Sequence, residues 1–136
     1  MKGIAGSGSV VRAELIGLAA SPGAASGDPD PLDAARTVRR ALADGKLKAL
    51  EVALIVVSAG LASGEQPHAD FVRLALGPHG TQVPSARAAD AQVIGIAAAG
   101  VMEIPGVAIA VLYESGRTLA LCLRRASASG GQSFVK

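Results

Sequence analysis

A chain of 136 residues is long enough for one domain with a substantial core, and 50% of its residues are apolar although it holds only two Phe, one Tyr and no Trp. Its 13 basic and 11 acidic residues give a net charge of +2. Neither a concentrated basic stripe nor stacking aromatic rings are present, which excludes nucleic acid as an expected partner, and the single Cys122 excludes an internal disulfide or a multi-cysteine metal site.

The first part of the chain predicts a strand, a helix and a second strand. Residues 1–9 read as a flexible Gly/Ser leader without the apolar run of a secretory signal, so we expect a cytoplasmic protein whose one domain covers residues 10–136. Branched, partly alternating residues predict a strand over 10–20. An amphipathic helix is expected over 31–44, followed by a fully apolar strand, covered on both faces, over 51–60.

The second part continues the alternation of helices and strands. We expect helices over 67–77 and 91–113, and strands over 81–86, 117–126 and 132–136. This order predicts a largely parallel sheet with helices packed on both faces.

The segment 91–113 is apolar for nearly the length that spans a bilayer, but Glu103 and Pro105 lie at its middle. A carboxylate at that depth costs several kcal/mol in lipid. We therefore expect one long buried helix outside any membrane, with Glu103 on a helix edge that reaches water.

Four stretches, taken in order, resemble the carboxyl-terminal half of a β-ketoacyl synthase, a member of the thiolase-like superfamily. They are AELIGLAAS, AARTVRRALADGKL, EVALIVVSAG and LALCLRRASASGGQSFV. The resemblance covers about residues 10 to 136 and implies an α/β fold that is half of a thiolase-like fold, a five-stranded mixed sheet with helices on both faces. In that family two related halves pack together, and only the second is present here.

The resemblance also implies that the catalytic residues are lost. Where the family has its first histidine, at the end of the second strand, this chain has Ser58. Where the family has a lysine and its second histidine, the spacing falls on Arg87 and Gln92. The nucleophilic cysteine of the family belongs to the missing half. Ser58, Arg87 and Gln92 are therefore expected to be vestigial positions, with no catalytic, cofactor-binding or metal-binding residue and no cofactor.

Loss of the histidines is similar to the chain-length-factor subunits of aromatic polyketide systems. The function this implies is a non-catalytic synthase-like domain of fatty-acid or polyketide biosynthesis, which acts through a homo-oligomer or a complex with a ketosynthase subunit, with acyl carrier protein as a further candidate partner. One alternative is the carboxyl-terminal part of a split acyltransferase whose cysteine is on another chain, so whether the chain is an enzyme stays open. Another is a decayed or truncated reading frame.

Individual residues have simpler interpretations as well. Ser58 lacks the glycine two residues earlier that a hydrolase elbow requires, because that residue is Val56. His68 and His79 are expected to be solvated, since no metal-binding cluster surrounds them. Cys122 lies in the apolar run LALCL and is expected to be a buried structural thiol.

Overall fold

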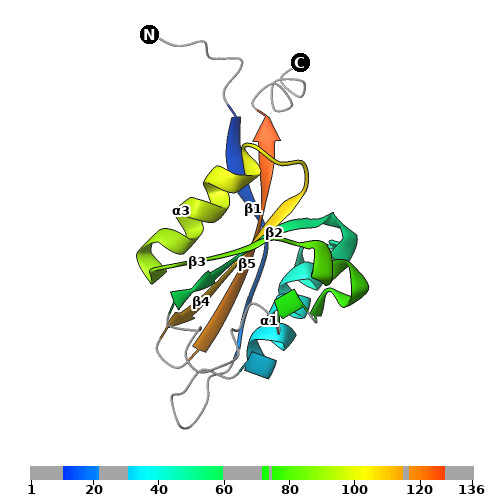
Figure 1. Ribbon diagram of the computed structural model, residues 1–136, viewed down its shortest axis with the longest axis vertical. Coiled ribbons are helices and arrows are strands. Elements are labelled where there is room, and N and C mark those ends of the chain that lie inside the picture. Colours follow the sequence, from blue (N-terminus) through cyan, green and yellow to red (C-terminus); the bar gives the residue numbers. More distant parts are fainter. Residues whose placement is uncertain (1–10, 22–30, 60–71, 74, 115–116, 128–136) are drawn as a thin grey trace.

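The structure, a computed structural model, describes residues 11–21, 31–59, 72–73, 75–114 and 117–127. It contains one five-stranded sheet with the strand order β1-β5-β4-β2-β3 and helices on both faces (Figure 1). The elements are β1 Val11–Ala20, α1 Pro31–Asp44, β2 Val52–Ser58, β3 Ser85–Ala88, α3 Asp90–Val101, β4 Val107–Glu114 and β5 Arg117–Ser127, with short 3-10 helices η2 Ala49–Glu51 and η4 Gly77–Gln82.

The sheet is mixed, as the resemblance implies. β2 pairs in parallel with both β3 and β4, whereas β5 is antiparallel to β4 and to β1. It follows that β1, β2, β3 and β4 all run in one direction, and that their carboxyl ends lie at the same edge of the sheet. Only β5 runs against them, because it follows β4 through a hairpin.

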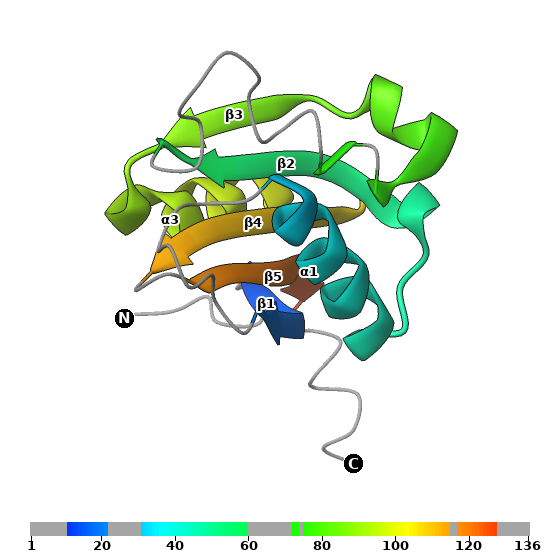
Figure 2. The ribbon, with the colours of Figure 1, turned by 90° about the horizontal axis from the view of Figure 1, so that it is seen from below.

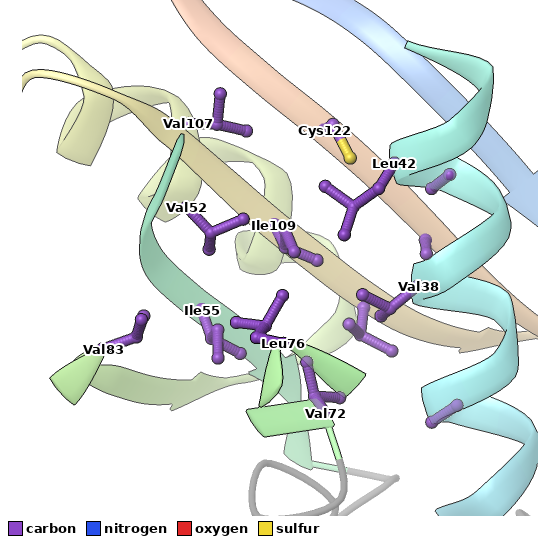
Figure 3. Close-up of a cluster of buried hydrophobic side chains, with 14 of the residues drawn as sticks. Val38, Leu42, Val52, Ile55, Val72, Leu76, Val83, Val107, Ile109 and Cys122 are labelled. Carbon is purple, nitrogen blue, oxygen red and sulfur yellow. The ribbon is translucent and has the colours of Figure 1, made fainter. Parts of the chain in front are cut away.

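The larger core lies on the face that α1 covers, in front of the sheet in Figure 2. Val38 and Leu42 of α1 pack there against branched side chains of the strands, among them Val52 and Ile55. Leu76 and Val83 belong to the same cluster (Figure 3). Cys122 is part of this cluster and fully buried, which confirms that its thiol lies in the core. With so few aromatic residues, this core depends on close packing of small branched side chains.

The opposite face is covered by α3, seen behind the sheet in Figure 2. Val93, Ala97 and Val101 recur every four residues and are fully buried against Val56 of β2 and the alanines of β4. A Cβ atom on Gly100 would collide with the side chain of Leu54, so α3 approaches the sheet closely. The Ala/Gly-rich sequence of α3 permits this close contact.

The expected long helix over 91–113 is wrong. α3 ends at Val101, and a turn leads into strand β4 at Val107. The turn needs Gly106, whose φ of +121° suits glycine alone, and Pro105 cannot continue a helix. Glu103 therefore lies exposed in a turn rather than on a helix edge. Among the described residues no helix is long and apolar enough to cross a membrane.

The remaining predictions divide into three groups. The strands expected over 10–20, 51–60 and 117–126 and the helix over 31–44 are confirmed as β1, β2, β5 and α1. The strand expected over 81–86 is wrong in its bounds, since η4 occupies its first residues and β3 begins at Ser85.

The third group lies mostly or wholly outside the described residues. It comprises the leader 1–9, most of the helix expected over 67–77, and the last strand over 132–136.

Candidate functional site

Ser58 is the last residue of β2 and lies at the carboxyl edge of the parallel strands. Its ladder partner on β3 is Ala88. On β4 the last paired residue is Val111, which lies beside Val57, one residue before Ser58. Because side chains alternate along a strand and Val57 faces α1, Ser58 faces α3. It is fully buried. In open α/β sheets this edge, where connections leave a central strand toward both sides, is the usual place of a ligand site.

The hydroxyl of Ser58 donates a hydrogen bond to Oδ1 of Asp90, the first residue of α3. A carboxylate at that position also interacts favourably with the amino-terminal end of the helix dipole. The bond therefore ties the end of β2 to the start of α3. A carboxylate is a far weaker base than an alkoxide, so Asp90 alone does not turn Ser58 into a nucleophile.

The three positions singled out by the resemblance do not converge. Arg87 is exposed on β3, and its ladder partner Val57 places it on the face of the sheet opposite α3. Gln92 is exposed in the first turn of α3. Ser58 is buried beneath that helix. A buried hydroxyl and two solvent-facing side chains do not form a common acid/base set.

A pocket of about 340 Å³ opens beside this edge, and its described lining is Asp90, Ala91, Leu112 and Tyr113. The first two residues begin α3, and the other two stand near the end of β4. The lining is mostly apolar, with one carboxylate and one phenol. It is chemically suited to an apolar group that carries a hydrogen-bond donor, and unsuited to an anion.

His79 differs from its expected solvated state. Its Nε2 atom lies 2.8 Å from the carbonyl oxygen of Val52, and the side chain is half-buried. Val52 begins β2, so His79 lies at the opposite end of that strand from Ser58. His68 is outside the described residues, and among those that are described no three His, Cys, Asp or Glu residues gather as metal ligands.

Sequence reasoning missed Asp90. The available signal was an acidic residue at the first position of a helix that directly follows a strand. That signal predicts a favourable helix start, and only the folded sheet shows that the same carboxylate reaches Ser58, 32 positions earlier.

No family model and no curated protein matches this sequence. Solved structures do match. Over 84% of this chain it superposes on a priming β-ketosynthase of a polyketide biosynthetic pathway, with a TM-score of 0.63 and 10% identity. Over 86% it superposes on 3-oxoacyl-(acyl carrier protein) synthase III from Pseudomonas aeruginosa, with a TM-score of 0.64 and 14% identity.

OleA from Xanthomonas campestris is similar over 84% of this chain and 57% of its own, with a TM-score of 0.60 and 14% identity. The chain spans about half the length of these proteins, covering 50% of the priming ketosynthase and 51% of the synthase III. At such identities the likeness shows the fold, which is half of a thiolase-like ketosynthase fold.

Proposed function

We propose that this chain is a non-catalytic β-ketoacyl-synthase-like domain of fatty-acid or polyketide biosynthesis that acts by associating with a synthase half or subunit. The observation that carries the proposal is the chemistry at the carboxyl edge. Ser58, at the end of the central strand, is buried and bonded to Asp90, whereas Arg87 and Gln92 are exposed.

Decarboxylation of a malonyl group needs donors that stabilise the developing enolate, a task suited to an imidazole. The one histidine that the structure describes, His79, is bonded at the other end of β2. The half-length match supports the second part of the proposal, because the proteins of similar fold are about twice as long.

The test is release of carbon dioxide from malonyl-loaded acyl carrier protein. We expect the isolated chain to match buffer alone, and Ser58→Ala to match the wild type, while a complete β-ketoacyl synthase serves as the positive control. Release above buffer that disappears in Ser58→Ala would show that the hydroxyl is catalytic, and the proposal would fail.

The pocket favours a second candidate, a split acyltransferase. A mostly apolar cavity of about 340 Å³ beside the end of β4 has room for part of an acyl chain when another protein supplies the cysteine. Repeating the assay with an added first-half chain that bears the cysteine separates the two. Activity of the mixture that falls when Ala91→Phe fills the pocket would support the split enzyme, and an inert mixture supports the non-catalytic domain.

A further inference from the structure

The outward face of α3 is unusual for a helix at a protein surface. No charged residue occurs between Ala91 and Met102, and the exposed residues include Ile94, Gly95 and Ile96. The two isoleucines are 44% and 39% exposed. On α1, by contrast, the exposed side carries arginines and Asp44. A helix that is apolar all round is normally covered on all sides.

A second, partly exposed apolar surface adjoins α3 on the same face of the sheet. It consists of four leucines, here called the leucine strip: Leu15, Leu18, Leu119 and Leu121. Leu15 and Leu18 are ladder partners of Leu123 and Leu121, which belong to or pack against the core under α3, and they are 51% and 49% exposed. α3 lies mainly over β2 and β4 and covers β5 and β1 only in part, so Leu15 and Leu18 of β1 stay about half exposed beside it (Figure 2).

We propose that a second copy of this chain covers both surfaces, with α3 of each copy seated on the leucine strip of the other. The inference rests on the proposed function, because it names the chain that takes the partner's place. One chain carries both a helix with an uncharged outer face and an apolar strip beside it, which is the self-complementarity that a two-fold interface requires.

The symmetry axis follows from covering both surfaces at once. A two-fold axis parallel to α3 sets the two helices side by side between the two sheets, each against the other's leucine strip. An axis across the helices would stack one helix on the other and leave both strips bare. The parallel axis also brings both α3 amino termini, and hence both pockets beside Asp90, to one end of the dimer.

The size of the surface sets the expected affinity. α3 has 12 residues and is therefore about 18 Å long and about 10 Å wide. The two strands of the leucine strip add about 10 Å of width. Measured flat, that footprint is on the order of 360 Å² per copy, smaller than the roughly 800 Å² of a standard interface. We therefore expect a reversible dimer with a dissociation constant in the micromolar range.

Two copies together are also about as long as the solved structures, since one copy covers about half of each. Length alone would equally allow a different chain as partner. The self-complementary pair of surfaces favours a second copy.

Gly95 offers a sharp test. A Cβ atom there would meet nothing within 4 Å, so Gly95→Glu leaves the monomer intact and places a charge at the centre of the outward face. Leu18→Glu places a charge on the leucine strip, at a side chain that is 49% exposed. The matched control is Ala43→Glu, which adds the same charge to the exposed side of α1 on the opposite face.

Sedimentation equilibrium of the full chain, from low micromolar to a few hundred micromolar protein, measures the outcome. We expect wild type and Ala43→Glu to approach twice the 13.4 kDa chain mass, and Gly95→Glu and Leu18→Glu each to dimerise about tenfold or more weakly while unfolding cooperatively. A wild type that stays monomeric, or a dimer indifferent to Leu18→Glu, would overturn the inference.

Other occupants give distinct results. A monomeric wild type whose binding to a ketosynthase subunit is lost in Gly95→Glu shows that a different chain covers α3, which overturns the second copy and leaves the proposed function standing. Release of carbon dioxide in the earlier assay overturns the non-catalytic role without affecting the dimer.

Discussion

At the scale of single residues, Ser58 and Asp90 decide how the carboxyl edge is interpreted. Each has a conventional explanation alone: a serine ending a buried strand, and an acid beginning a helix. Together they join β2 to α3 by a hydrogen bond to a carboxylate. The sequence resemblance identified Ser58 as the position of interest but could not supply its partner, because that contact depends on how α3 crosses the sheet.

If this bond is structural, its loss should appear in stability. We expect Ser58→Ala and Asp90→Ala each to lower the free energy of unfolding, with a coupling of about 1 kcal/mol in the double-mutant cycle, measured by urea denaturation. Asp90→Asn, which keeps an acceptor oxygen, is the control and should lose less. A coupling near zero would mean that the two side chains do not support one another.

Cys122 gives a prediction that depends on pH. Burial, with a smaller effect of the Asp44 carboxylate, raises the pKa of the Cys122 thiol from 9.0 to about 12. Because only the thiolate reacts, a thiol reagent at mildly alkaline pH should label the native protein about a thousandfold more slowly than the unfolded chain. Equal labelling rates with and without denaturant would contradict the buried position.

The same shift fixes the direction of a stability change. The protonated thiol is favoured in the folded state, so its contribution to the free energy of unfolding is complete below pH 9.0 and is lost as the pH rises toward about 12.

At the scale of elements, glycines show where helices meet strands. A Cβ atom on Gly17 of β1 would collide with the backbone carbonyl oxygen of Ala41 in α1, whereas Gly95 of α3 faces open space. We expect Gly17→Ala to destabilise the protein by about 1–3 kcal/mol, because backbone cannot move aside as a side chain can. Gly95→Ala should instead stabilise it by about 0.5–1 kcal/mol through helix propensity.

Thermal unfolding at a protein concentration that keeps the chain monomeric checks both changes. Similar shifts for the two variants would show that α1 does not lie on β1 as closely as the structure has it.

The elements also show which sequence patterns were informative. β2 and β5 could be predicted because their apolar runs are short and bounded by polar or glycine residues. The long helix could not be separated from α3 and β4 in this way, since apolar residues fill the segment from Ala91 to Tyr113. The decisive information was local, in Pro105 and Gly106, and the run of Val, Ala and Ile after them favours a strand.

At the scale of the whole molecule, the order of helices and strands was sufficient to predict an α/β sheet covered on both faces. The antiparallel direction of β5 could not be predicted in this way, because it depends on the turn at Gly106 that the sequence analysis missed. Once β4 is a strand, a hairpin joins it to β5. The missed turn also left the burial of individual apolar residues in this segment unassigned. In the structure Val93, Val101, Val107 and Ile109 are buried, and Ile94 and Ile96 are exposed.

The pairing of β1 with β5 joins the first described strand to the last, from Val11 beside Ser127 to Ala20 beside Leu119. As the chain leaves the ribosome, β1 emerges well before its described partner strand β5, which is complete only after Ser127 has been made. α1 also packs on both strands, so its own docking surface is incomplete until then. Contacts so distant in sequence form slowly, and the nascent chain must hold the leucine-bearing strand β1 unpaired until β5 has been made, when chaperone binding would matter most.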